Sequence, residues 1–322
     1  MKGKTIKLIK NRSDIGAGTR GADMGIDAME IAAINKGNQY FNEYEHIDVP
    51  TRNESIYEKS ISPYGKRIDQ VLEQCVDVAE IIKQTLQNDK FPIVFSGDHS
   101  SALGTISGIK AAFPEKILGV IWIDAHADIH SPYTTPSGNL HGMPLAAAMH
   151  LDNLECQVNR VESEVVSYWE QLKKVGSEEP KLQPEHLVYF GVRDTEDPED
   201  QLIDRLGIRL FKVEDVRRKG VEVCVSQTAT LLQACDYIYI SFDVDSMDSE
   251  RISSGTGTPV PAGFDPVEIK ALLRGLVQIG KTVCFEVVEV NPLLDNRGNK
   301  MAEVAFDILQ DVTKDIEAVN NS

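Results

Sequence analysis

The chain has 322 residues, of which 42 % are hydrophobic and 26 % are charged, so it can bury a sizeable core. This balance excludes a disordered chain and a fibrous repeat. The formal net charge of −17 disfavours nucleic acid as a partner, because an acidic surface repels phosphate backbones and attracts small cationic molecules.

Eight short runs rich in Val, Ile, Tyr and Phe predict strands along the chain. Most of them are apolar on both faces instead of alternating, which is the pattern of a parallel sheet covered by helices on both sides. The predicted strands are Ile6–Ile9, His46–Val49, Pro92–Ser96, Leu118–Asp124, Leu187–Val192, Ile208–Lys212, Tyr237–Phe242 and Val283–Val290.

Stretches with helical spacing of apolar residues lie between these strands. They are Ile61–Asn88, Ser101–Phe113, Met143–His150, Glu162–Val175, Asp200–Leu206, Gly220–Ala234, Pro266–Ile279 and Met301–Ile316. Because strand and helix alternate from end to end, we predict one doubly wound α/β sandwich over residues 1–322. Residues 151–184 are the least regular part, and we predict a surface insertion there.

The N-terminus and the cysteines indicate the compartment. The first 14 residues carry lysines but no long apolar core, and the longest apolar run, Ile117–Ile123, is too short to span a bilayer. The five cysteines are odd in number, scattered and never in CxxC spacing, which favours free thiols in a reducing compartment. We therefore expect a cytoplasmic protein without a membrane partner.

Gly16, Gly18 and Gly21 form a GxGxxG pattern that resembles a dinucleotide-binding fingerprint. The fit is poor, because five residues separate the preceding strand from Gly16 and no acidic residue closes a second strand about 20 positions on. A glycine-rich loop with positive φ angles is the favoured interpretation.

Acidic and imidazole side chains follow three of the predicted strands, in residues 94–100, 122–128 and 240–248. Asp124, His126 and Asp128 are two residues apart, so an extended backbone points all three to one side. Asp243 and Asp245 share the same parity on their own strand. Since ligands bind at the carboxyl ends of strands in open parallel sheets, we expect these side chains to converge.

Such a gathering of carboxylates is unfavourable without cations, because each loses hydration and repels its neighbours. A single Asp after a strand is often only a helix N-cap, but the joint pattern favours a metal site. Oxygen-rich ligation with one imidazole per ion suits manganese, and zinc, cobalt and iron remain compatible with the ligand types. The carboxylates concerned are Asp98, Asp124, Asp128, Asp243 and Asp245.

At these residues the sequence resembles the ureohydrolase family, and its arginase branch in particular. The matching segments are SGDHS (96–100), DAHAD (124–128), TTPSGNLHG (134–142), SFDVDSMD (241–248), GTGTP (255–259) and EVNP (289–292). The resemblance implies a three-layer α/β/α sandwich around a mostly parallel eight-stranded sheet, two Mn²⁺ ions per chain, and a homo-oligomer, either a trimer or a hexamer. It assigns one ion to His99, Asp124, Asp128 and Asp243, and the other to Asp124, His126, Asp243 and Asp245. Asp98 is outside this ligand pattern, and we expect it to orient its neighbours.

The resemblance also implies the reaction, which is hydrolysis of L-arginine to L-ornithine and urea by metal-bound hydroxide. His141 is the expected proton shuttle, since the ordinary pKa of histidine lies near neutrality. Glu289 is expected to receive the guanidinium through paired hydrogen bonds. Asp128 is expected to bind metal and also to accept a hydrogen bond from the hydroxide.

The amino-acid end of the substrate is assigned with the same resemblance. Ser137 and Thr135 are expected to meet the α-carboxylate, together with His130, which stands where the family pattern has asparagine. The acidic loop Asp194-Thr195-Glu196-Asp197 is one residue longer than its family counterpart. Either Glu196 or Asp197 is expected to meet the α-amino group, with Asp197 favoured, and Asp194 and Thr258 are further candidate contacts. Ser249 also departs from the family pattern, which runs on to Asp-Pro there.

Three alternatives stay open. The same mechanism fits agmatine, a guanidino acid or formiminoglutamate as substrate. His130 and the longer acidic loop depart from the family pattern, so they leave the choice among these substrates open. A single-zinc deacetylase of related fold would lack the second set of ligands, and a non-catalytic binding protein would commonly have lost a ligand or the shuttle. The metal content per chain, two, one or none, separates these classes.

Overall fold

The computed structural model describes residues 3–60 and 62–321, and it contains one eight-stranded sheet in the order β2-β1-β3-β8-β7-β4-β5-β6. All pairings between these strands are parallel. The strands are β1 (Thr5–Asn11), β2 (Glu45–Asp48), β3 (Lys90–Ser96), β4 (Leu118–Ile123), β5 (Leu187–Phe190), β6 (Arg209–Phe211), β7 (Tyr237–Asp243) and β8 (Thr282–Val288). The predicted parallel α/β sandwich is therefore confirmed.

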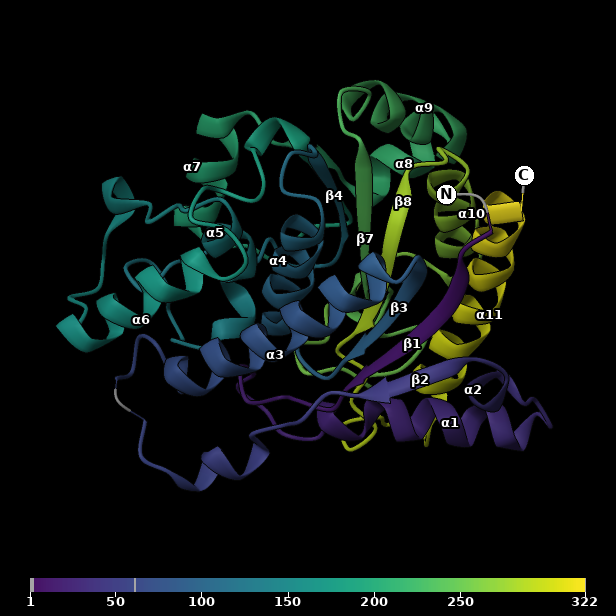
Figure 1. The fold of residues 1–322 in the computed structure, drawn as a ribbon, viewed down its shortest axis with the longest axis horizontal. Coiled ribbons are helices and arrows are strands. Elements are labelled where there is room, and N and C mark those ends of the chain that lie inside the picture. Colours follow the sequence, from purple (N-terminus) through teal and green to yellow (C-terminus); the bar gives the residue numbers. More distant parts are fainter. Residues whose placement is uncertain (1–2, 61, 322) are drawn as a thin grey trace.

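Eleven α-helices surround the sheet in the described part of the chain (Figure 1). They are α1 (Gly25–Asn35), α2 (Tyr40–Glu43), α3 (Ile68–Gln87), α4 (Ala102–Ala112), α5 (Pro144–Ala148), α6 (Ser163–Lys174), α7 (Asp197–Leu206), α8 (Val213–Lys219), α9 (Val221–Leu231), α10 (Pro266–Val277) and α11 (Lys300–Asn321). None of these helices is long and apolar enough to cross a membrane.

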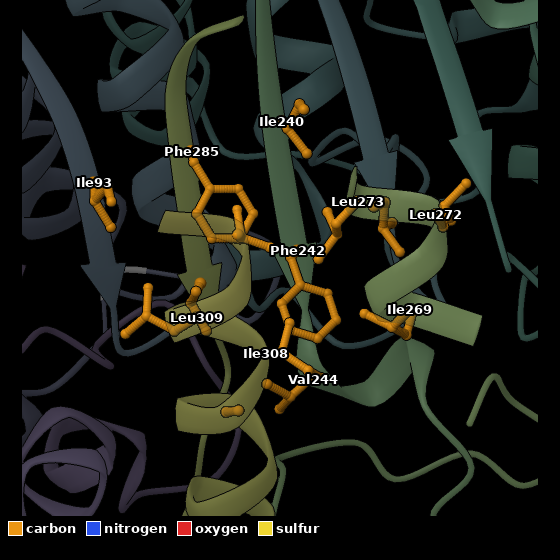
Figure 2. Packing of buried hydrophobic residues seen from close by; sticks show 14 of the residues in the cluster. Ile93, Ile240, Phe242, Val244, Ile269, Leu272, Leu273, Phe285, Ile308 and Leu309 are labelled. Atoms are coloured by element: carbon orange, nitrogen blue, oxygen red, sulfur yellow. The ribbon is translucent and has the colours of Figure 1, made fainter. Parts of the chain in front are cut away.

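Two apolar cores lie on opposite faces of the sheet. One packs the sheet against α1, α2, α8, α9, α10 and α11, and the other packs it against α3, α4, α5, α6 and α7. Successive residues of a strand belong to different cores, so Ile121 faces the first and Trp122 the second. This explains the continuous apolar runs in the sequence, because both faces of every central strand are buried. Figure 2 shows part of the first core, where Phe242 lies near Ile269 of α10 and Ile308 of α11.

The helix boundaries differ from the prediction where local chemistry overrides the apolar stripe. The helix expected from Ile61 begins at Ile68, because residues 62–67 form a turn with Pro63 and Gly65 in it; Ile61 itself lies outside the described residues. The helices α2 and α8 were not predicted, since both are short and α8 ends at Gly220 with a φ of 88°.

The order of the strands brings the polar segments together. Strands β3, β8, β7 and β4 are consecutive neighbours at the centre of the sheet. Because they are parallel, the residues that follow them lie at the same edge. The division of the chain into one domain with an insertion at residues 151–184 stays a prediction; that stretch contains α6, which packs on α3.

Candidate metal centre

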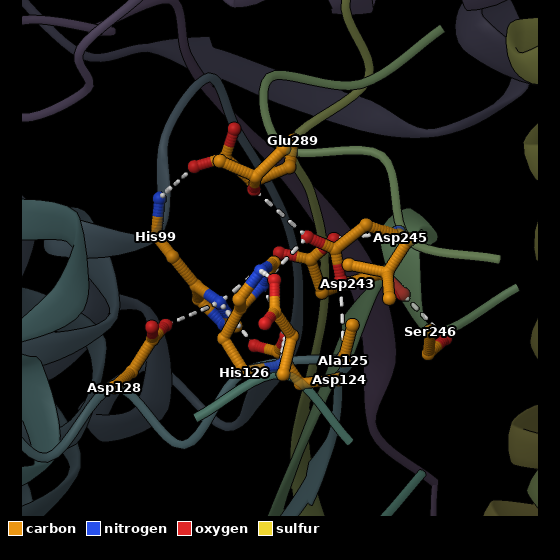
Figure 3. A network of polar contacts seen from close by, with 12 residues as sticks. His99, Asp124, Ala125, His126, Asp128, Asp243, Asp245, Ser246 and Glu289 are labelled. Carbon is orange, nitrogen blue, oxygen red and sulfur yellow. Dashed lines mark hydrogen bonds and ion pairs between the residues drawn. The ribbon is translucent and has the colours of Figure 1, made fainter. Parts of the chain in front are cut away.

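His99 lies among three carboxylates that come from two other strands. Its Nδ1 atom is 3.0 Å from Oδ2 of Asp124, 3.1 Å from Oδ2 of Asp128 and 3.2 Å from Oδ2 of Asp243 (Figure 3). All four side chains are buried. We call these residues the His99 group.

The ring of His99 is fixed from its other side. Nε2 is 2.7 Å from Oγ of Ser241, and the imidazole stacks on the indole of Trp122 with ring centroids 3.9 Å apart. Nδ1, in contrast, has no partner with hydrogen-bond geometry, and neither has Oδ2 of Asp124. A buried imidazole nitrogen and a buried carboxylate oxygen that face each other without a hydrogen bond fit a shared cation between them.

A second set of ligand atoms lies beside the first. Nδ1 of His126 is 3.0 Å from Oδ2 of Asp245 and 3.4 Å from Oδ1 of Asp124. We call Asp124, His126 and Asp245 the His126 group. Asp124 therefore has one carboxylate oxygen near each of the two imidazoles.

Backbone donors orient the carboxylates of both groups. Oδ1 of Asp124 accepts the N–H of His126 at 2.7 Å, and Oδ1 of Asp245 accepts the N–H of Ala125 at 3.1 Å. Oδ1 of Asp243 accepts the N–H of Asp245 at 2.7 Å, so only its Oδ2 faces His99. These contacts leave one oxygen of Asp243 and of Asp245 turned toward the imidazoles, as a ligand must be.

The electrostatics of the two groups demand positive charge. Burial raises the pKa of Asp243 well above its usual range, and repulsion from Asp245 and Asp124 raises it further. Burial alone would lower the pKa of His99, but the nearby carboxylates of Asp124, Asp128 and Asp243 outweigh it and raise that pKa well above the ordinary value. Protons must stay in the cluster, or divalent cations must replace them. The residues therefore fit metal ions.

Asp98 does not face the metal groups. Its carboxylate accepts the N–H of Gly16 at 2.9 Å and the N–H of Ser100 at 2.8 Å. A Cβ on Gly16 would lie 2.4 Å from Oγ of Ser100, so only glycine allows the loop to approach this closely. Gly21 has a φ of 120°. The GxGxxG segment is thus a loop that Asp98 fixes through Gly16, and of its three glycines only Gly21 has the expected positive φ.

His141 and Glu289 lie together beside the His99 group. Nδ1 of His141 is 3.3 Å from Oε1 of Glu289, and the same oxygen accepts the N–H of His99 at 3.0 Å. Oε2 of Glu289 is buried and has no partner. Glu289 also has a φ of 67°, and Asp128 one of 50°, a backbone conformation that non-glycine residues adopt mainly where the surroundings impose it.

Both metal groups open into one pocket with a volume of about 250 Å³. Nine of the residues expected to act on substrate or metal line this pocket: His99, His126, Asp128, Thr135, Ser137, His141, Asp243, Asp245 and Glu289. His130, Asp194 and Thr258 line it as well, and Oγ1 of Thr258 lies 3.2 Å from Oδ2 of Asp245. Asp124, fully buried, lies beneath the pocket.

The acidic loop differs from the expectation at one residue. Asp197 is exposed at the start of α7 and is not among the pocket-lining residues, whereas Glu196 and Glu199 are. Pro198 stands in the first turn of the helix, and Glu196 and Glu199 form a capping box across its start. That spacing was present in the sequence and places the helix start at Asp197, which leaves Glu196 at the end of the loop. Of the two residues considered for the α-amino group, Glu196 therefore lines the pocket and Asp197 does not.

His130 contacts this loop. Its Nε2 is 2.9 Å from Oε2 of Glu196 and 3.5 Å from Oε2 of Glu199, and its Nδ1 is 3.0 Å from Oγ1 of Thr134. The hydrogen bond to His130 lowers the pKa of Glu196 to about 2, although partial burial opposes the shift. Burial raises the pKa of Glu199 well above its usual range.

Comparison with known proteins gives one consistent result. A model of the arginase family matches residues 5–314. An arginase from Bacillus caldovelox is 34 % identical over 310 residues, which cover 95 % of this chain and 97 % of that protein. The solved structure of the Bacillus caldovelox arginase has a TM-score of 0.81 at 32 % identity, covering 96 % of this chain and 98 % of that one. The Bacillus subtilis arginase structure has a TM-score of 0.78 at 31 % identity, with the same coverage.

Proposed function

This chain belongs to the arginase family, and from that premise we propose that it hydrolyses L-arginine to L-ornithine and urea. The observation that supports this most directly is the pair of Asp/His groups that share Asp124 in one pocket with His141 and Glu289. The alternatives are not favoured. Relatives that match 95 % of the chain are named arginase, and two sets of ligands exceed what a single-zinc deacetylase needs.

We propose that the centre holds two divalent ions, with manganese first among the candidates. His99, Asp124, Asp128 and Asp243 would hold one of them, and Asp124, His126, Asp243 and Asp245 the other. When bound, the ions would supply hydroxide at neutral pH and would stabilise negative charge on the way to the tetrahedral intermediate.

Glu289 is the residue that we propose to bind the guanidinium. Its Oε2 is buried without a partner, and a Cβ on Gly257 would come within 3.1 Å of that oxygen, so the glycine keeps the space beside it open. A guanidinium presents paired N–H donors that match a carboxylate. A bound guanidinium would therefore satisfy an oxygen that is otherwise left unpaired in the interior.

His141 is the residue that we propose to protonate the leaving amine. Burial opposes the charged form, but the hydrogen bond to Glu289 outweighs burial and raises the pKa of His141 to about 9. With Nδ1–H donated to Glu289, the proton that His141 transfers is the one on Nε2. Asp128 lines the same pocket and is the carboxylate that we expect to accept a proton from the attacking water.

Among the residues that line the pocket, Thr135 and Ser137 would offer hydroxyl groups to the α-carboxylate, and Glu196 would offer its carboxylate to the α-amino group. Asp194 lines the pocket as well, but its Oδ2 lies 3.7 Å from Nε2 of His126. The contact of the α-amino group with Glu196 replaces the one expected at Asp197. The homo-oligomer, trimer or hexamer, and the cytoplasmic location stay expectations of the family resemblance.

The test is urea release after manganese loading, with L-arginine and agmatine offered in parallel to wild type and His126→Ala. We expect release from L-arginine that the substitution abolishes, together with a lower manganese content per chain. His46→Ala is the matched control, because His46 is exposed on the edge strand β2. Release from agmatine instead of arginine would refute the substrate, and full activity of His126→Ala would refute the metal assignment.

A further inference from the structure

His130 has no ring N–H left for a substrate. Nε2 faces Oε2 of Glu196 at 2.9 Å, and Nδ1 faces Oγ1 of Thr134 at 3.0 Å. If the ring is neutral with the proton on Nε2, it donates to Glu196 and accepts from Thr134, whose Oγ1 in turn accepts the N–H of Ser131 at 3.1 Å. If the ring is charged, its two N–H groups donate to the same two partners, Glu196 and Thr134.

We propose that His130 is a positioning residue, which holds the carboxylate of Glu196 in the pocket to receive the substrate's α-ammonium and does not itself bind the α-carboxylate. The inference rests on the proposed function, since it takes the reacting guanidinium to lie at Glu289. It assigns to His130 a role different from the contact expected from the sequence.

His130 adds a side-chain donor to the one restraint that Glu196 has within its own segment, the capping box with Glu199 at the start of α7. The side chain of Glu196 is 54 % exposed, whereas that of His130 is 7 % exposed and packed. A glutamate at the end of a loop samples many rotamers, and a fixed hydrogen-bond donor restricts them before the substrate arrives. The rigid partner is therefore the histidine, and the carboxylate is the group that it orients.

The two other acids near Glu196 that line the pocket, Glu199 and Asp194, have contacts of their own. Glu199 accepts the N–H of Ile129 at 3.3 Å and the N–H of Glu196 at 3.2 Å, so its oxygens hold the backbone around His130 and Glu196. Asp194 is 65 % exposed, and its Oδ2 lies 3.7 Å from Nε2 of His126, on the side of the metal centre. Glu196 is thus the carboxylate that His130 presents to the pocket.

The α-carboxylate still has donors from residues 135–139, namely the hydroxyls of Thr135 and Ser137 and the side-chain amide of Asn139, all of which line the pocket. Oγ1 of Thr135 accepts the N–H of Gly138 at 2.9 Å, and Oγ of Ser137 accepts the N–H of Asn139 at 3.2 Å. Each hydroxyl keeps its own proton to donate.

Two ligands that differ only in the carboxylate separate this role from direct contact. L-ornithine carries both an α-ammonium and an α-carboxylate, and putrescine lacks the carboxylate. We would titrate each by calorimetry into the manganese-loaded full chain, for wild type, His130→Asn, Glu196→Gln and the double variant. Glu185→Gln is the control, since Glu185 is exposed and does not line the pocket. Thermal unfolding of each variant checks that it is folded.

We expect Glu196→Gln to weaken both ligands by about tenfold, the size of one charge-assisted hydrogen bond at a half-exposed site. His130→Asn should weaken both ligands by one common factor, and the double variant should resemble Glu196→Gln alone, because the two residues act through one contact. A loss for L-ornithine but not putrescine in His130→Asn would overturn the inference, and so would multiplicative losses in the double variant or unchanged binding in both single variants. If the manganese-loaded wild type released no urea from L-arginine, the proposed function on which the inference rests would be refuted instead.

Discussion

Replacing Glu289 by glutamine removes one negative charge from the pocket and keeps the shape of the side chain. Oε1 of Glu289 accepts the N–H of His99 at 3.0 Å, so the amide oxygen of glutamine can take over that contact. The amide nitrogen would then stand at the position of Oε2, which is buried without a partner. It would present a donor to the donors of the guanidinium, and the charge pairing would be lost as well.

The size of the effect follows from this geometry. Truncating one member of a buried, hydrogen-bonded charge pair typically costs about 2–5 kcal/mol of binding. A loss of about 3–4 kcal/mol here corresponds to a fall in kcat/KM of about 10²- to 10³-fold for L-arginine. The stability of the free protein should change little, because loss of the Glu289 charge removes repulsion of the buried Asp98 and attraction of the buried His141 together.

The assay is steady-state urea release from L-arginine, with metal content and thermal unfolding measured on the same samples. Glu286→Gln is the matched control, since Glu286 is equally buried on β8 but accepts hydrogen bonds from Ser96 and Tyr239 away from the pocket. It should leave KM and kcat unchanged and lower the free energy of unfolding instead. A less than tenfold loss in Glu289→Gln, or an equal loss in the control, would refute the role given to Glu289.

Three further predictions concern the shuttle, the pH dependence of stability and the core. His141→Asn should lower kcat for urea release about 10²- to 10⁴-fold with little change in KM, since it removes the proposed proton donor; an unchanged kcat would refute that role. Burial lowers the pKa of Lys181 to about 8. Between pH 8 and the ordinary pKa of lysine, the unfolded chain therefore binds more protons than the folded chain, and the free energy of unfolding rises with pH. Lys181→Met should therefore have a higher free energy of unfolding than wild type at pH 7, as measured by urea denaturation. This difference should shrink by about 2 kcal/mol from pH 7 to pH 9.5, and a constant difference would contradict this. Phe285→Ala should lower the free energy of unfolding by about 3–5 kcal/mol, because Phe285 is fully buried between the sheet and its helices; a loss below about 1 kcal/mol would show that the core collapses around the gap.

The sequence by itself determined the sheet and the location of the centre. The central strands, such as β4 and β5, follow from apolar runs, because a parallel strand buried on both faces needs apolar side chains at every position, whereas the edge strand β2 is largely exposed. The acids and imidazoles that interrupt these runs, such as Asp124 after β4 and Asp243 at the end of β7, mark the strand ends. Since parallel strands end at one edge, the convergence of the His99 and His126 groups could be expected without coordinates.

Tertiary structure alone decided the partners of the loop residues. His130 and Glu196 are 66 positions apart, and no periodicity indicates that they meet. Nor does the sequence show that Glu196 lines the pocket while Asp197 is exposed, unless the capping box at α7 is recognised first. The direction of a loop side chain depends on individual φ and ψ angles, such as the φ of 67° at Glu289, and the surrounding packing imposes these angles. Regular strands repeat one backbone conformation and can be predicted from the sequence pattern, whereas the contacts that set substrate recognition arise only when distant loops meet.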